Sequence, residues 1–348
     1  MSRSPKFLPA GKIKSKVLAS LLEKYCSSKG DERVILGSQI GEDAAVIDMG
    51  ERYLIAKSDP ITFLDYQQGF YNKIGYWAVN VNVNDIATCG GVPKWFQATV
   101  LLPENNTTED LIEEIFKDIH TTCNNFGITV VGGHTEVSTG LSKPLVIGCL
   151  LGEVEKGKLV RTSGAQVGDA IILTKGIVIE GTSIIAQEKE KELLKKGFDH
   201  DYLNKCKQFI YDPGISVLKE ALIANQNFLV HSMHDPTEGG LACGLFEVAY
   251  GSQNGILIDY DSIKIFPESK KLCKEYGLNP LGTISSGSLL ITLDKDDAHN
   301  LIKLLGENGI FASKIGIVVK KEEGLKIIEG GKKTTLPYSE TDEITKIF

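Results

Sequence analysis

Residues 231–241 read HSMHDPTEGGL. Asp235 is a residue type that caps helices, the proline after it is favoured at the first helical position, and Glu238 follows three residues after the cap, so this stretch predicts a capping box that opens a helix. Gly239 and Gly240 then fall in the first turns, where each costs about 1 kcal/mol relative to alanine. A cap alone does not require these glycines, so the stretch indicates a helix start that something else approaches closely.

Strand and helix patterns alternate on both sides of this stretch. An apolar run over 227–233 predicts a strand before it, and apolar residues at helical spacing predict a helix over 236–250. In the first half of the chain, residues 44–59 predict two strands joined by a turn, and residues 70–89 predict a helix. Further helices are predicted over 13–26 and 108–125, and buried strands over 127–133 and 144–154. Hairpins mixed with strand–helix units predict an α+β fold rather than a purely parallel sheet.

The length of the chain predicts two domains. A chain of 348 residues is too long for one ordinary hydrophobic core and suits two domains of about 150–200 residues each. The polar, glycine-containing stretch 155–169 is the predicted junction. We therefore expect an N-terminal domain over 1–157, with a mixed sheet and helices, and a C-terminal α/β domain over 158–348.

Composition excludes several classes of function. The net charge is −7 and the basic residues are scattered, so nothing favours nucleic-acid binding. No apolar run reaches the ~20 residues needed to span a bilayer, and the first residues lack the apolar region of a secretory signal. Seven cysteines lie far apart without metal-ligand spacing, which is typical of a reduced protein, so we expect a cytoplasmic location.

Four aspartates lie beside glycine, proline or a turn at the edge of an element: Asp43, Asp59, Asp85 and Asp235. If the first predicted hairpin turns at 49–50, Asp43 lies opposite about residue 56 or 57, and Asp59 lies near the same end. Because a strand rises ~3.3 Å per residue, the carboxylates of Asp43 and Asp59 can reach one small volume. Like charges this close repel unless a cation such as Lys57 or a divalent metal shares the site.

The residue types favour a hard metal ion and phosphate. Carboxylates without histidine or cysteine clusters suit Mg²⁺, Mn²⁺ or Ca²⁺ better than zinc. Glycines at helix starts let backbone N–H groups approach phosphates, and residues 180–182 and 237–240 are such places. The chain contains no GxxxxGK[ST] and no GxGxxG after a strand, which disfavours the usual nucleotide-binding loops.

Structural interpretations remain open for each of these residues. An aspartate before a helix is commonly a cap, and the GGHTEV stretch over 132–137 can be a glycine turn with His134 bonded to backbone. The serines of 285–287 can likewise form a turn. Asn84 and Asp85 are harder to explain structurally, because neither residue favours a helix interior and both closely follow Asn80 and Asn82.

The order of the motifs gives a stronger signal than any one of them. GEDAAV, SDP, NDIATCGGVP, GGHTEV, VGDAIILTKG and DPTEGGL follow one another along the chain. This order resembles the superfamily of aminoimidazole ribonucleotide (AIR) synthase, which includes thiamine-monophosphate kinase, selenophosphate synthetase and the hydrogenase-maturation protein HypE. The resemblance covers about residues 10–320, and the wording of DPTEGGL is most similar to HypE.

The resemblance implies a two-domain fold in which the N-terminal sheets of two chains join into a barrel, so a homodimer is expected. It also implies ATP and Mg²⁺ in a cleft near that interface. The residues that match are expected to act as follows: Asp43, Asp59, Asp85 and Asp235 as metal ligands; Asp85, Asp235 and His134 in catalysis; Lys57, Asn84, Gly132, Gly133, Thr182, Gly239 and Gly240 in binding ATP or its phosphates.

The implied function is ATP- and Mg²⁺-dependent phosphorylation, followed by dehydration, of an amide-type oxygen, with hydrogenase maturation as a setting. HypE proteins carry their substrate on a C-terminal cysteine, whereas no cysteine follows Cys273 in this sequence, so an external substrate is expected. Two alternatives stay open. One is a small-molecule enzyme similar to AIR synthase or thiamine-phosphate kinase, and the other is a non-catalytic nucleotide-binding scaffold for a maturation partner.

Overall fold

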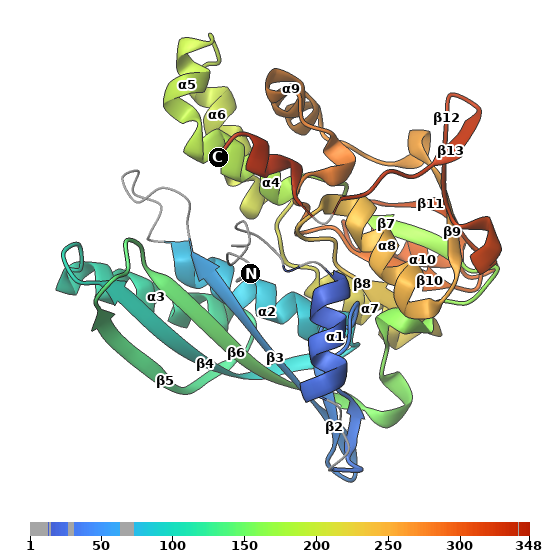
Figure 1. Ribbon diagram of the computed structural model, residues 1–348, viewed down its shortest axis with the longest axis horizontal. Coiled ribbons are helices and arrows are strands. Elements are labelled where there is room, and N and C mark those ends of the chain that lie inside the picture. The colour runs from blue at the N-terminus through green and yellow to red at the C-terminus, as the bar shows by residue number, and fades with distance from the viewer. Residues whose placement is uncertain (1–12, 14, 27–30, 63–72, 340) are drawn as a thin grey trace, which may run out of the picture.

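The computed structural model describes residues 13, 15–26, 31–62, 73–339 and 341–348. The chain forms two mixed β-sheets, each with its own helices (Figure 1). The α+β prediction is therefore confirmed. Among the described residues, no helix is both long enough and apolar enough to cross a membrane.

The N-terminal sheet has six strands in the order β1-β2-β3-β6-β4-β5. Neighbouring strands are antiparallel except for the parallel pair β4–β5. The strands are β1 (Val34–Leu36), β2 (Ala45–Asp48), β3 (Arg52–Thr62), β4 (Val92–Pro103), β5 (Thr129–Ser138) and β6 (Leu145–Glu155), and the helices are α1 (Ser15–Tyr25), α2 (Ile74–Thr88) and α3 (Glu109–Asn125).

The C-terminal sheet has seven strands in the order β13-β12-β9-β11-β7-β10-β8. Among the described strands of this sheet, only the neighbours β9 and β12 are parallel. The strands are β7 (Ala170–Thr174), β8 (Val230–His234), β9 (Gly255–Asp259), β10 (Leu290–Leu293), β11 (Ala312–Val319), β12 (Leu325–Glu329) and β13 (Lys332–Thr335). The helices are α4 (Ile179–Glu188), α5 (Glu190–Lys195), α6 (His200–Lys207), α7 (Leu218–Asn227), α8 (Gly240–Ser252), α9 (Pro267–Tyr276) and α10 (Ala298–Glu307).

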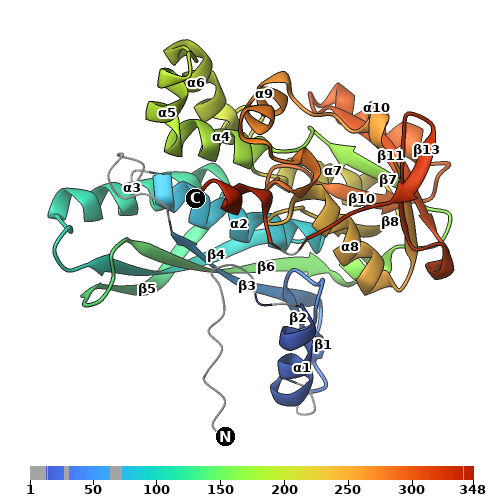
Figure 2. The ribbon, with the colours of Figure 1, turned by 45° about the horizontal axis from the view of Figure 1, so that its top comes forward.

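Helix α2 lies between the N-terminal sheet and the C-terminal part of the chain (Figures 1 and 2). Nearly all of its residues are buried, which is typical of a helix that is covered on every side. It packs on β3 and β6 on one side and contacts α7 on the other. Gly148 of β6 permits this close approach, because a Cβ there would lie 2.4 Å from Nδ2 of Asn82.

Hydrogen bonds from side chains join the two halves of the chain. The Asn84 amide on α2 donates to the Ile215 carbonyl (2.8 Å) and accepts from the Val217 N–H (2.9 Å). The Glu42 carboxylate accepts the N–H groups of Thr162 and Ser163 at 3.1 and 3.2 Å. Backbone groups held in this way fix where α2 lies relative to the C-terminal sheet. The domain boundary after residue 157 remains a prediction.

Two details differ from the sequence predictions, and a third cannot be compared with them. Residues 129–138 form a strand, but β5 is the exposed edge of its sheet and not buried, because no described strand or helix covers it. The sequence favours Thr107, followed by Asp110, as the cap of the helix over 108–125, but the capping residue of α3 is Thr108, whose side chain accepts the Leu111 N–H. Residues 70–72 of the predicted helix 70–89 lie outside the described residues.

Candidate functional site

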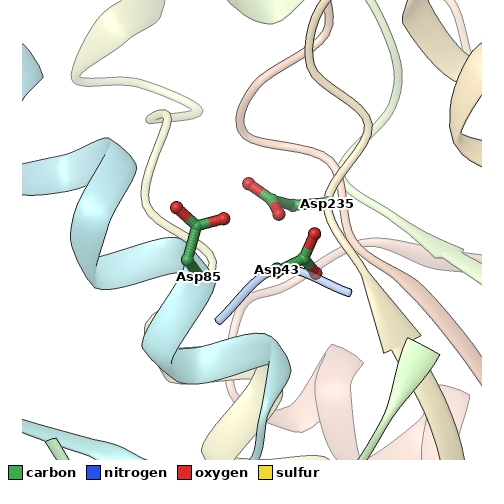
Figure 3. Close-up of side chains that lie close together, drawn as sticks. All are labelled: Asp43, Asp85 and Asp235. Atoms are coloured by element: carbon green, nitrogen blue, oxygen red, sulfur yellow. The ribbon is translucent and has the colours of Figure 1, made fainter. Parts of the chain in front are cut away.

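Three aspartates from separate elements meet at one point (Figure 3). Asp43 lies in the loop before β2, Asp85 in the last turns of α2, and Asp235 directly after β8. One carboxylate oxygen from each lies within 4.8 Å of the others. The cluster therefore depends on both halves of the chain, and the Asn84 contact beside Asp85 is what holds α2 against the C-terminal part.

The capping-box prediction for Asp235 is wrong. Helix α8 begins at Gly240, four residues later than Pro236, and its N-cap is Gly239 with a φ of 79° and no side-chain cap. Because Asp235 does not cap α8, its carboxylate points to Asp43 and Asp85 (Figure 3). The aspartate is thus part of the acidic cluster and not of the helix start.

The two costly glycines have a structural explanation. A Cβ on Gly239 would lie 2.7 Å from Cβ of Cys243, and a Cβ on Gly240 would lie 2.6 Å from the Thr283 carbonyl. Positive φ values of 79° and 61° also favour glycine at both positions. The Gly239 N–H donates to Asp342 Oδ2 at 2.6 Å. The chain itself therefore approaches this helix start closely.

Lys57 links the fourth predicted aspartate to the cluster. Its ammonium nitrogen lies 3.2 Å from Asp85 Oδ2 and 3.3 Å from Asp59 Oδ2. Asp59 is half exposed and is not among the three converging carboxylates. The hairpin register pairs Ala45 with Ala56, so the ladder, extended by two residues, places Asp43 beside residue 58. The prediction of residue 56 or 57 was one to two residues off.

His234 is a residue of the site that the sequence did not reveal. Its Nδ1 lies 3.2 Å from Asp43 Oδ2, and its Nε2 lies 2.8 Å from Glu247 Oε2. The only local signal was its position next to Asp235 at the end of a strand. Glu247 lies on α8, 13 residues further along, so no sequence pattern joins the two.

The pKa shifts of the three aspartates show that the neighbouring cations offset the effect of burial at Asp43 but not at Asp85 or Asp235. Burial opposes ionisation of Asp43, but the charges of His234 and Lys57 outweigh it and lower its pKa below 3.8. Burial raises the pKa of Asp85 well above its ordinary value, against the effect of Lys57. Burial and the charge of Asp43 raise the pKa of Asp235 to about 8. Burial thus opposes the ionisation of Asp85 and Asp235, and a bound cation would favour their charged forms.

The partners of the cluster are cationic. Burial alone would lower the pKa of His234, but Asp43 and Glu247 outweigh it and raise that pKa well above 6.5. Asp85, Asp59 and Asp43 likewise outweigh the burial of Lys57 and raise its pKa. Both side chains therefore carry positive charge at neutral pH. Oxygen donors at this spacing fit a hard divalent cation such as Mg²⁺.

Family models match both halves of the chain. The N-terminal domain of AIR synthase related protein matches residues 41–154, and its C-terminal domain matches residues 166–328. A protein of Methanocaldococcus jannaschii named as a hydrogenase expression/formation protein is 30% identical over 307 residues, which cover 84% of this chain and 84% of the relative.

The chain belongs to the AIR synthase related protein family.

Other members carry more specific names. Carbamoyl dehydratase HypE of Cupriavidus necator is 27% identical over 305 residues, covering 83% of this chain and 79% of that protein. A solved structure of hydrogenase maturation protein HypE in complex with ATP has a TM-score of 0.65 at 21% identity, covering 95% of this chain and 96% of that one. This likeness shows that the AIR synthase related fold is shared.

Several residues predicted from this family resemblance make contacts within the protein. The nitrogen and the oxygen of the Asn84 side chain both form hydrogen bonds with backbone groups. Asn84 therefore links the two halves of the chain. The Thr182 hydroxyl is buried and bonds the Val178 carbonyl and Ser269 Oγ, each at 2.6 Å. Gly239 and Gly240 pack against the chain itself, as described above. The structure thus gives each of these four residues a contact within the protein.

The GGHTEV stretch lies on the edge strand β5. Asp59 pairs with Gly148, Gly148 with Ala98, and Ala98 with Gly133, so Gly133 lies three strands from Asp59, about 14 Å at the usual strand spacing. Gly132 precedes it on β5. The exposed His134 ring lies 3.0 Å from Glu136 Oε2. The phosphate-binding and catalytic roles of these three residues remain predictions.

Proposed function

We propose that this protein transfers the γ-phosphoryl group of ATP, in a Mg²⁺-dependent reaction, to an oxygen of an acceptor substrate. The observation that carries the proposal is the convergence of Asp43, Asp85 and Asp235 from both halves of the chain. Such a set has little structural purpose without a cation, because burial raises the pKa of both Asp85 and Asp235 and so opposes their ionisation. A relative named selenide, water dikinase and a solved HypE structure in complex with ATP support a phosphoryl-transfer role.

The three aspartates would hold the metal. Bound Mg²⁺ would supply neutralisation of the charge on the β- and γ-phosphate oxygens. The residues of this chain prepare the site: Lys57 lies between Asp59 and Asp85 and keeps both carboxylates near the phosphate path. The Lys57 ammonium also contacts Asp59, which is more exposed than Asp85. A phosphate can reach the ammonium from the side of Asp59.

His234 and Glu247 orient the cluster. With both ring nitrogens bonded to carboxylates, the His234 ring has a fixed orientation, and through it the Asp43 carboxylate is fixed as well. Residues that orient metal-binding groups in this way commonly change metal affinity by 10–100-fold when they are replaced. His234 and Glu247 are therefore positioning residues in the proposal.

The acceptor is proposed to be a carboxamide. Its oxygen forms a bond to the γ-phosphorus while the bond from that phosphorus to the β–γ bridging oxygen breaks, and ADP leaves. Loss of the phosphorylated oxygen as phosphate, together with both amide protons, converts the carboxamide to a nitrile. The net change removes water from the amide and hydrolyses ATP. The name carbamoyl dehydratase, carried by members of the family, supports this acceptor class.

A homodimer is proposed through β5. This edge strand exposes Val130, Val131 and Val137, and an exposed apolar edge strand is a ready template for pairing with another chain. Light scattering after size exclusion should give the mass of two chains. Val131→Lys should shift that mass toward one chain, while Val17→Lys on the exposed face of α1 serves as a matched control.

A second candidate is a nucleotide-binding scaffold without turnover. The observation that favours it is the Lys57 ammonium, which already neutralises part of the charge on Asp85 and Asp59. Release of ADP separates the two candidates, because a scaffold binds ATP without releasing ADP, alone or with a hydrogenase-maturation partner.

The direct test is calorimetric titration of ATP into the protein with and without Mg²⁺. Wild type should bind ATP only with Mg²⁺, and Asp85→Asn should bind at least tenfold more weakly, since the metal loses a charged ligand. Asp110→Asn, an exposed aspartate in the first turn of α3, is the matched control. Equal binding by Asp85→Asn and wild type would refute the proposal.

A further inference from the structure

Glu180 is a buried carboxyl group with an unused oxygen. It lies in the first turn of α4 and is 6% exposed. Its Oε2 has no hydrogen-bond partner in the part of the chain that the structure describes. Leaving a buried polar atom unpaired is destabilising. We therefore expect Glu180 Oε2 to bind a partner that the described residues do not provide.

Four segments meet around this carboxyl group. The Val178 N–H at the start of α4 donates to Ser285 Oγ at 3.0 Å, and the Ser285 N–H donates to the Thr237 carbonyl at 3.4 Å. The Gly239 N–H donates to Asp342 Oδ2 at 2.6 Å. These bonds tie together the start of α4, the loop before α8, the 283–288 loop and the C-terminal segment. Hydrogen bonds between these segments therefore fix the surroundings of Glu180.

The charges around Glu180 are all negative. Burial raises its pKa to about 7, and the charges of Asp342 and Glu238 add to this effect, while hydrogen bonds from Ser286 oppose it. Burial likewise raises the pKa of Asp342 to about 6. Within the described ranges, no lysine, arginine or histidine forms an ion pair with Glu180, Glu238 or Asp342. Glu180 thus has two carboxylates, Asp342 and Glu238, near enough to raise its pKa, and no cationic partner among the described residues.

We propose that Glu180, Glu238 and Asp342 form a subsite that binds a primary ammonium group of the acceptor substrate. The free acceptor is Glu180 Oε2. Both oxygens of Asp342 already accept backbone N–H bonds, from Gly239 and Ile344, so Asp342 supplies charge more than free lone pairs. A compact N–H cation fits this arrangement, whereas Mg²⁺ needs several free oxygen ligands in near-octahedral order.

One residue of the subsite, Glu238, lies on the same loop as Asp235 of the aspartate cluster. Glu238 follows Asp235 by three residues, and that short loop separates the two groups of carboxylates. An acceptor whose ammonium group binds at Glu180 can therefore extend along the loop and bring its oxygen to the aspartates. This reach rests on the proposed function, whereas the ammonium subsite itself does not.

The test uses the full chain and a simple probe. Thermal unfolding is followed with methylammonium chloride from 0 to 100 mM at constant ionic strength, with tetramethylammonium chloride as the probe that has the charge but no N–H donor. Wild type should show a saturable rise of about 2 °C with methylammonium alone, because ligands that bind only the folded state raise its melting temperature. Glu180→Gln should lose this rise. Glu109→Gln, an exposed first-turn glutamate of α3, should keep it.

Each other outcome has a definite meaning. An equal rise in wild type and Glu180→Gln, no rise in wild type, or an equal rise with tetramethylammonium would overturn the subsite. A Glu180-dependent rise with MgCl₂ alone would also overturn it and assign the group to a metal. If Glu180→Gln does not fold, Ser286→Ala, which removes one hydrogen bond to Glu180 and keeps the charge, should weaken methylammonium binding several-fold, and unchanged binding would overturn the subsite.

A parallel titration separates the subsite from the proposed function. ATP with Mg²⁺ should bind Glu180→Gln and wild type within twofold of each other. If ATP fails to bind either protein while the methylammonium effect stands, the proposed function fails and the subsite survives. If ATP binds both proteins and methylammonium has no effect, only the subsite fails.

Discussion

The Asp43–Asp85–Asp235 cluster contacts two cationic side chains, Lys57 and His234, whereas the Glu180–Glu238–Asp342 group has no ion-pair partner among the described residues. The first cluster draws on both halves of the chain, and the second draws only on the C-terminal half. Both groups hold carboxyl groups with raised pKa values. This difference fits the two proposals: a metal and phosphates would bind at the first cluster, and an ammonium group at the second.

The largest expected effect tests the first cluster. Asp235→Asn removes one charged metal ligand and should lower the rate of ATP-dependent phosphoryl transfer by about 1000-fold, on the order of the losses seen when a charge-stabilising group is removed. ADP release, measured with and without Mg²⁺, is the readout. Asp296→Asn at an exposed site is the control. A loss of less than threefold would mean that the first cluster does not act in the reaction.

The second prediction concerns the link that assembles the first cluster. Asn84→Leu leaves the Ile215 carbonyl and the Val217 N–H without their partners and should lower the free energy of unfolding by about 3–4 kcal/mol, since each unpaired buried group costs about 1–3 kcal/mol. Urea denaturation measures this change in the free energy of unfolding. Asn124→Leu, at an exposed position of α3, should change stability by less than about 0.5 kcal/mol. Equal stability of the two variants would show that the Asn84 link is dispensable.

The third prediction tests the second group through pH. The pKa of Glu180 is raised from 4.5 to about 7 in the folded chain, so the unfolded chain loses this proton first as pH rises. Wild type therefore loses stability from this residue between about pH 4.5 and 7, whereas Glu180→Gln does not. At pH 8 the variant should be more stable than wild type by about 2–3 kcal/mol.

Urea denaturation at pH 4.5 and pH 8 provides the comparison. The two proteins should differ little in unfolding free energy at pH 4.5, where the carboxyl group is protonated in the folded chain and only half ionised in the unfolded chain. A difference between wild type and Glu180→Gln that does not change with pH would show that Glu180 ionises freely and that the second group is not short of a cation.

The smallest expected effect concerns the positioning residues. Glu247→Gln weakens the hold on the His234 ring, through which Asp43 is oriented, and should raise the dissociation constant for Mg²⁺ in the presence of ATP about tenfold. Calorimetric titration measures that constant. Glu322→Gln, in an exposed turn, is the control. An unchanged dissociation constant for Mg²⁺ in Glu247→Gln would show that His234 and Glu247 do not orient the metal ligands.

Sequence predicted the fold class and three members of the cluster, because the aspartates stand at element ends within an ordered set of motifs. It did not predict where α8 begins. The local pattern around Asp235 fits a cap, but Asp342, over 100 residues further along the chain, accepts the Gly239 N–H instead. It also missed His234 and Glu247, since their contact depends on how α8 packs beside β8. Contacts between distant segments decide these features, and local patterns do not record them.

The central claim is that Asp43, Asp85 and Asp235 bind one divalent cation together with ATP. Mn²⁺ can replace Mg²⁺, and free Mn²⁺ is counted by electron paramagnetic resonance at fixed protein concentration. Wild type with ATP should bind Mn²⁺ beyond the amount that ATP alone retains, and Asp43→Asn, Asp85→Asn and Asp235→Asn should each abolish that excess while Asp110→Asn preserves it. Undiminished Mn²⁺ binding in all three cluster variants would contradict the account.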